Sequence, residues 1–219
     1  MNKKEIINNT IHFVKETLKG TESGHDWFHI ERVYRNALLI SSDEKANEFI
    51  VVLAALLHDI ADAKFNNGDE AVGPQKAYEF LITQQIDQEI ITHIVNIVKH
   101  ISFKNSLSKN EKTFYSNELN IVQDADRLDA IGAIGIARCF NYGGFKNREI
   151  YNPKIEPNLN MTKEEYKNSS APTLNHFYEK LLLLKDTMNT KAGARIALNR
   201  HRFMEEFLEQ FHAEWEGRK

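Results

Sequence analysis

A histidine and an aspartate, His58 and Asp59, stand at the end of the apolar run 49–57. Burying an imidazole and a carboxylate without partners would cost several kcal/mol, so both groups need compensation. A divalent cation compensates both at once, since neutral imidazole and ionised carboxylate are common metal ligands in proteins. The alternative interpretation is structural: His58 satisfies the last carbonyls of a helix, and Asp59 caps the next turn.

Two other segments carry the same residue types. His29 falls in the first turn of a helix that Asp26 is expected to cap, and Asp126 lies in an otherwise apolar helix. Side chains from three helices can converge on one ion inside a helical bundle. His29, His58, Asp59 and Asp126 are therefore candidate ligands of one metal. Such mixed nitrogen and oxygen ligation suits Mn, Fe, Zn, Co or Ni, and Mg less well.

The order of these residues, H…HD…D, resembles the HD-domain superfamily of metal-dependent phosphohydrolases, with the first histidine in the setting His25-Asp26-Trp27-Phe28-His29-Ile30-Glu31-Arg32-Val33. The segments 24–29, 58–62 and 124–132, with 176–182 and 200–204 near the C-terminus, resemble its small bacterial branch. Characterised members of that branch hydrolyse nucleoside triphosphates to monophosphate and pyrophosphate.

The resemblance implies that His29, His58, Asp59 and Asp126 hold one divalent metal ion. Mn is the expected metal, with Fe, Co, Ni, Zn or Mg as alternatives. The ion would polarise a phosphoryl oxygen and activate a water molecule.

Asp62 is the expected catalytic acid/base. It lies three residues after Asp59, where several superfamily members carry an acidic residue that orients or deprotonates water. The alternative is a surface aspartate at the end of a helix. Relatives that hydrolyse hyperphosphorylated guanine nucleotides have a Glu-Asp pair here, so the pair Asp62-Ala63 disfavours that substrate.

Phosphate groups need cationic or hydrogen-bonding partners. The candidates for substrate binding are His25 before the first ligand, Lys64 after Asp62, His100 on the helical face of His93 and Asn96, and Arg200 on the last long helix. A solvated side chain is the alternative for each of them.

Helices must position these candidate residues, and the spacing of apolar residues predicts where the helices lie. Apolar residues at helical spacing predict helices over about 6–18, 26–38, 48–59, 73–83, 87–101, 116–140, 173–188 and 190–216. No alternating strand pattern and no internal repeat stand out. We therefore expect an all-α fold of roughly seven to nine helices, and the resemblance implies that it is an HD-domain-type bundle.

The segment 141–172 breaks this periodicity and holds three of the four prolines. A long irregular insert in a compact domain is typically a functional lid or a mobile excursion. We expect one domain over residues 1–219, with this insert as a candidate lid.

Composition limits the partners. The formal net charge of -3 over 219 residues gives no basic field for duplex nucleic acid, and no apolar run is long enough to cross a membrane. The single cysteine, Cys139, excludes an intramolecular disulfide framework and a Cys-rich zinc cluster. Residues 1–6 are charged and then amphipathic, without the apolar core of a signal peptide, so a cytoplasmic location is the default expectation. A small phosphorylated substrate, expected to be a nucleotide, fits these limits. The oligomeric state stays open.

The preferred hypothesis is hydrolysis of (deoxy)nucleoside triphosphates to monophosphate and pyrophosphate. The first alternative is another phosphatase or phosphodiesterase activity on the same site, acting on a nucleoside monophosphate, a cyclic nucleotide or a guanine alarmone. The second is a non-catalytic module that senses a nucleotide and keeps the metal for structure.

Overall fold

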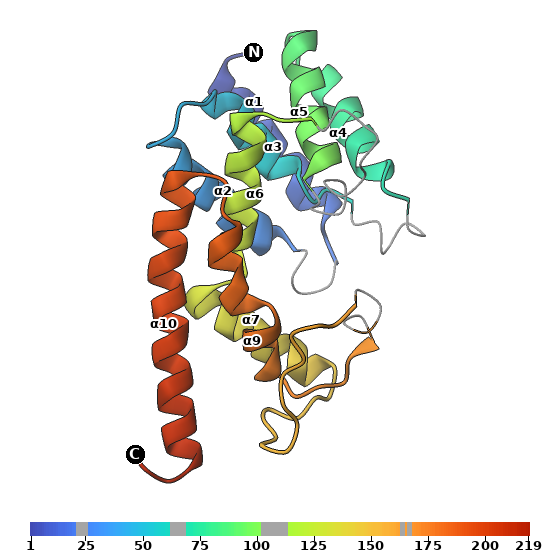
Figure 1. Ribbon diagram of the computed structural model, residues 1–219. Helices are drawn as coiled ribbons and strands as arrows, with labels where there is room; N and C mark the ends of the chain where they lie inside the picture. The colour runs from blue at the N-terminus through green and yellow to red at the C-terminus, as the bar shows by residue number, and fades with distance from the viewer. Residues whose placement is uncertain (21–25, 62–68, 102–113, 163–164, 166–167) are drawn as a thin grey trace. The chain divides into compact units, whose positions relative to one another are not determined.

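The computed structural model describes residues 1–20, 26–61, 69–101, 114–162, 165 and 168–219 (Figure 1). All regular structure in these ranges is helical, which confirms the all-α prediction. No helix among them is long and apolar enough to span a bilayer. The chain divides into two compact units, Met1–Asp126 and Arg127–Lys219, which are described separately. The single-domain expectation stays a prediction.

The first unit is built around α3 (Glu48–Leu57), whose residues from Phe49 to Leu57 are all buried. A helix that is apolar on every face must be surrounded by other elements. It packs against α1 (Lys3–Thr17), α2 (Trp27–Ser41) and α5 (Gln88–His100), and α4 (Val72–Ile82) packs against α5 (Figure 1). The predicted central buried helix is thus confirmed, and it ends at Leu57, directly before His58.

Helix α2 begins where the sequence indicated. The side chain of Asp26 accepts a hydrogen bond of 3.0 Å from the backbone N–H of His29, the usual pairing at a helix N-cap. This cap fixes the start of α2 and places His29 in its first turn. Helix α6 (Asn117–Asp129) carries Asp126 in its last turns.

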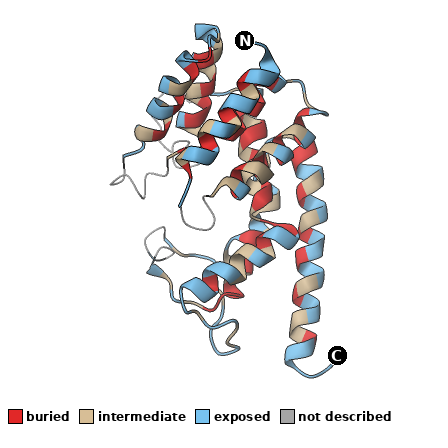
Figure 2. Cartoon of the chain, turned by 180° about the vertical axis from the view of Figure 1, so that it is seen from behind, coloured by how far each residue is buried: buried red, intermediate tan, exposed pale blue. Residues whose placement is uncertain are grey.

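The second unit contains α7 (Gly132–Phe145), α9 (Asn175–Glu179), the 3-10 helix η3 (Leu181–Thr187) and α10 (Lys191–Trp215). Helix α10 packs against α7 and η3, and its buried residues recur along one face between exposed ones (Figure 2). The rings of Phe140, Phe177 and Phe207 pack against one another with centroids 5.8 to 5.9 Å apart. This aromatic cluster forms part of the core of the second unit.

Two predicted helices are wrong in extent. The helix expected over 116–140 is divided into α6 and α7, because Ile131 is extended and Gly132 adopts a φ of +74°. Helix α7 then continues to Phe145, into the segment expected to be irregular. The helix expected over 173–188 is divided into α9 and η3 at Lys180, whose φ and ψ of -146° and -56° are not helical. The helix expected over 190–216 is confirmed, with Thr190 as its N-cap.

Candidate metal centre

Three of the four predicted ligands meet at one point of the first unit. His29 comes from α2, His58 follows α3 and Asp126 comes from α6. One potential ligand atom from each residue lies within 4.8 Å of the other two. The Oδ1 atom of Asp126 lies 3.5 Å from Nε2 of His29 and 3.9 Å from Nε2 of His58. The two imidazole rings meet edge to face, with centroids 5.4 Å apart.

The backbone selects the tautomer of His58. Its Nδ1 lies 2.9 Å from the carbonyl oxygen of Ala55, one turn earlier in α3. Because a carbonyl oxygen only accepts, Nδ1 carries the proton and donates. In the neutral ring this leaves the lone pair on Nε2, the atom that faces Asp126. The arrangement matches that of metal-binding histidines, whose second nitrogen is held by a carbonyl or carboxylate.

The three clustered side chains differ in how far they are buried. The side chains of His29 and His58 are each 4% exposed, whereas that of Asp126 is 45% exposed. The imidazoles are therefore fixed by packing, and the group opens to solvent on the carboxylate side. The nitrogen–oxygen separations are too long for good hydrogen bonds. They are close to the separation of about 3.0 to 3.5 Å between two ligands that share an ion at about 2.1 Å.

The chemistry of this donor set fits a divalent metal. Two imidazole nitrogens and one carboxylate oxygen suit Mn, Fe, Co, Ni or Zn better than Mg or Ca, which prefer oxygen ligands alone. Three protein ligands also leave coordination positions for water and substrate.

Asn36 is a supporting residue that sequence reasoning missed. Its buried side chain donates a hydrogen bond of 3.2 Å from Nδ2 to the carbonyl oxygen of Ala125, the residue directly before Asp126. Asn36 follows His29 by seven residues and so lies on the same face of α2. An asparagine among Ile30, Val33, Ala37 and Ile40, which are all buried, was the available signal.

Asp59 does not belong to the group of three that the structure brings together. It follows His58 in the turn after α3 and is half-buried. Its role as a ligand stays a prediction. Asp62, His25 and Lys64 lie outside the described residues, so their predicted roles also stay predictions.

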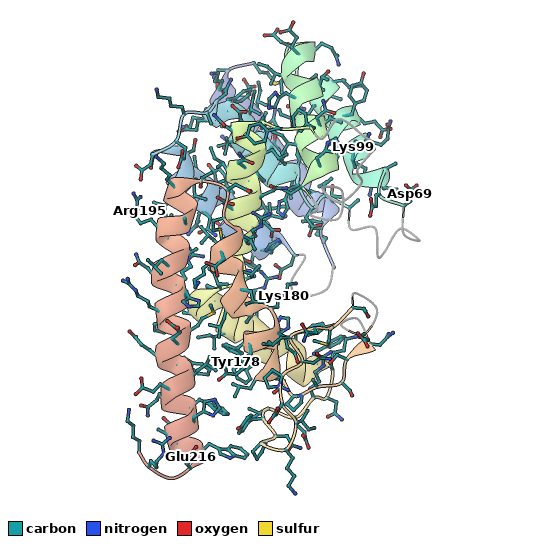
Figure 3. The ribbon with its side chains drawn as sticks, viewed as in Figure 1. Asp69, Lys99, Tyr178, Lys180, Arg195 and Glu216 are labelled. Carbon is teal, nitrogen blue, oxygen red and sulfur yellow. The ribbon has the colours of Figure 1, made fainter. Side chains whose placement is uncertain are left out.

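Two residues that are predicted to bind substrate make hydrogen bonds within the protein. His100, the last residue of α5, lies with Nδ1 2.8 Å from the carbonyl oxygen of Asn96 and therefore donates to it. Arg200 donates from Nη1 to the carbonyl oxygen of Leu128 within the second unit. Burial lowers the pKa of Arg200 from its ordinary value, and the nearby carboxylate of Asp129 opposes that shift. Arg195, near the start of α10, is exposed (Figure 3). A role for His100 or Arg200 in binding substrate stays a prediction.

Comparison with known proteins places the chain in a family. The HD domain profile matches residues 27–131, the range that contains all three clustered residues. The Bacillus subtilis protein YpgQ is 37% identical over 205 residues, which cover 94% of this chain and 91% of YpgQ. The chain belongs to the HD superfamily. This superfamily comprises metal-dependent phosphohydrolases, so the HD domain identifies an enzyme of that class.

Solved HD structures agree over nearly the whole chain. The HD-superfamily hydrolase of Bacillus thuringiensis is 45% identical, with a TM-score of 0.79 over 98% of this chain and 99% of that one. Bacillus subtilis YpgQ in complex with ADP is 34% identical, with a TM-score of 0.74 over 98% and 97% of the two chains. The similarity therefore extends beyond the HD match to the second unit.

Proposed function

We propose that this HD-superfamily enzyme uses one divalent metal ion, Mn by preference, to hydrolyse nucleoside triphosphates to the monophosphate and pyrophosphate. The observation that carries the proposal is the convergence of His29, His58 and Asp126 from three helices within 4.8 Å. The ADP bound to YpgQ, a relative that matches almost end to end, supports a nucleotide as the ligand.

When bound, the cation supplies Lewis acidity toward water and toward a phosphoryl oxygen. The residues of this chain supply its position. His29 and His58 present buried nitrogen donors, and the bond from His58 to Ala55 fixes which nitrogen is offered. The half-exposed side chain of Asp126 supports the proposal that a polyphosphate approaches the ion from the solvent side.

Asp59 and Asp62 complete the proposal. Asp59, in the turn after α3, is proposed as a fourth residue that would hold the metal. Asp62 is proposed to orient or deprotonate the attacking water. His25 and Lys64 are proposed to contact the phosphates, as electrostatic partners of the charge that develops on the leaving group.

Isotope labelling tests the reaction class and the bond that is cleaved. The full-length chain is stripped with a chelator, supplied with Mn and incubated with nucleoside triphosphates in water enriched in oxygen-18. We expect equal amounts of monophosphate and pyrophosphate, with the label in the monophosphate because water attacks the α-phosphorus. Release of orthophosphate alone, or label in the pyrophosphate, would contradict the proposed reaction.

Variants connect the activity to the site. His58→Ala removes one donor and is expected to lower kcat by at least about a hundredfold, because the metal contributes several kcal/mol of transition-state stabilisation. His12→Ala is the matched control, since His12 is an exposed histidine of α1 outside the clustered group. Equal activities of the two variants would refute the assignment of the site.

A further inference from the structure

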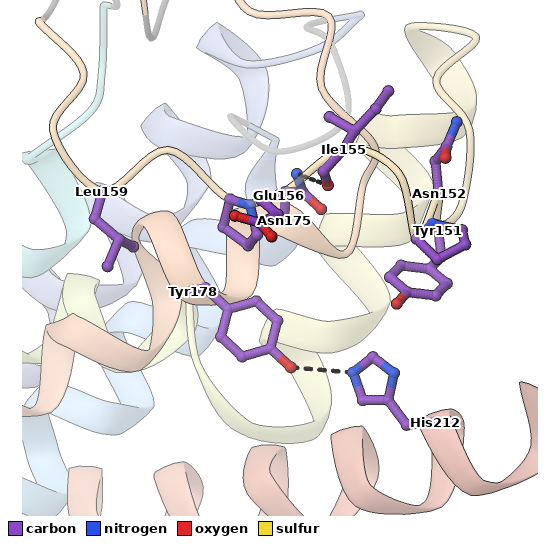
Figure 4. A pocket seen from close by; sticks show the side chains of 10 residues that line it. Tyr151, Asn152, Ile155, Glu156, Leu159, Asn175, Tyr178 and His212 are labelled. Atoms are coloured by element: carbon purple, nitrogen blue, oxygen red, sulfur yellow. Dashed lines mark hydrogen bonds between the residues drawn. The ribbon is translucent and has the colours of Figure 1, made fainter. Parts of the chain in front are cut away.

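A cavity of about 390 Å³ lies in the second unit, outside the region that matches the HD domain. Figure 4 shows that its walls come from the segment 151–159 on one side and from α9 and α10 on the other. This volume falls within the range of small-molecule sites, about 300 to 1,000 Å³. The segment 151–159 belongs to the insert 141–172, which the sequence predicts to be irregular.

Aromatic rings form a linked wall of this cavity. The hydroxyl of Tyr178 lies 3.1 Å from Nε2 of His212, and the ring of Tyr151 meets the His212 ring edge to face with centroids 5.3 Å apart (Figure 4). Tyr151 also meets Trp215 edge to face at 5.0 Å. Each ring is therefore held by at least one neighbour, and the wall is already formed before any ligand arrives.

The polar side chains that line the cavity indicate which class of ligand it could bind. The amide of Asn175 is engaged, because its Nδ2 donates to the carbonyl oxygen of Ile155 at 3.1 Å. The amide of Asn152 donates to Glu149 and accepts from the backbone N–H of Lys154. Among the described residues that line the cavity, Glu156 is the only acid, and there is no lysine or arginine. Ile155 and Leu159 add exposed aliphatic surface.

This combination favours a cation and disfavours a phosphate. An anionic ligand would meet the carboxylate of Glu156 with no lysine or arginine in the described lining to offset it, and the imidazole of His212 is engaged by the hydroxyl of Tyr178. An ammonium group would instead be attracted to Glu156. Tyrosine rings add attraction for organic cations through their quadrupoles. We propose that this cavity, whose lining includes none of the proposed metal ligands, binds a small organic ammonium ion with an aromatic or aliphatic body.

The test uses three probes of similar shape and different charge: 2-phenylethylammonium, 2-phenylethanol and 3-phenylpropanoate. Trp215 contacts Tyr151, so its indole N–H resonance in a nitrogen-15 NMR spectrum reports binding, and Trp27→Phe assigns the signal by removing the other tryptophan. We expect saturable shifts with the ammonium. Its dissociation constant should be about fivefold lower than that of the alcohol, the upper range for an exposed ion pair. The carboxylate should bind most weakly.

Glu156→Gln should bring the ammonium and alcohol affinities within about twofold of each other, because it keeps the shape and removes the charge. Glu209→Gln, on the exposed surface of α10 and outside the cavity lining, should keep the preference and serves as the matched control. Three results would overturn the proposal: no saturable shift, equal affinity for all three probes, or an ammonium preference that survives Glu156→Gln. Phosphohydrolase activity does not enter the measurement, so its outcome is independent of the proposed reaction.

Discussion

Gly132 is the first residue of α7, directly after the break that ends α6, and replacing it with alanine should be costly for two additive reasons. Its φ is +74°, a left-handed conformation that costs an alanine about 1 kcal/mol. An added Cβ would also lie 3.0 Å from both Cβ and Cγ of Arg200. Arg200 is restrained in turn, because its guanidinium donates to the carbonyl oxygen of Leu128.

Accommodating an extra carbon in a packed site costs about 1 to 3 kcal/mol. The sum predicts that Gly132→Ala lowers the free energy of unfolding by about 2 to 4 kcal/mol. Gly20→Ala is the matched control: its φ is +80°, and no described atom lies within 4 Å of the added Cβ. It should lose only the backbone term, about 1 kcal/mol.

Urea denaturation of both variants, followed by far-UV circular dichroism, measures the difference. A loss for Gly132→Ala that exceeds the loss for Gly20→Ala by at least about 1 kcal/mol supports the steric contact with Arg200. Equal losses would refute it and leave the backbone conformation as the whole effect.

Three further predictions address other residues. Asn36→Leu removes the hydrogen bond to Ala125 while keeping a side chain of similar volume. Titration calorimetry should show that the dissociation constant of Mn rises about tenfold. An unchanged Mn affinity would contradict a role for Asn36 in positioning Asp126. Burial, with Lys180 and Arg148 nearby, lowers the pKa of His176 to about 4, so the native state disfavours its protonation. The stability present above about pH 6.5 should therefore fall, by at most about 3 kcal/mol, as the pH drops toward about 4, and His176→Gln should flatten this loss in urea titrations at several pH values. Burial raises the pKa of the Cys139 thiol to about 12. A disulfide reagent should therefore modify Cys139 at least about a hundredfold more slowly in the folded chain than in the urea-unfolded chain. Equal rates would show that the thiol is accessible in the folded chain.

Sequence reasoning succeeded where one local pattern determines the outcome. The apolar run ending at Leu57 required a surrounded helix, and the cap at Asp26 determined where α2 begins. The start of α2 and the end of α3 determine where His29 and His58 lie in the chain. In the structure their side chains lie close to each other and to Asp126.

Helix boundaries predicted from the sequence were wrong where tertiary contacts override the apolar periodicity. The apolar pattern continues through Gly132, so nothing local showed the left-handed turn that Arg200 packs against. The same holds for Lys180, where a helical pattern gives way to a 3-10 helix. Asn36 was overlooked because a single amide on an apolar face is informative only when its partner on α6 is known.

His29, His58 and Asp126 are proposed to hold one divalent cation. Anomalous diffraction at the Mn absorption edge, from crystals grown with Mn, tests it directly. We predict one strong peak about 2 Å from Nε2 of both histidines and from a carboxylate oxygen of Asp126. A peak at other residues, or none at this group, would contradict the claim.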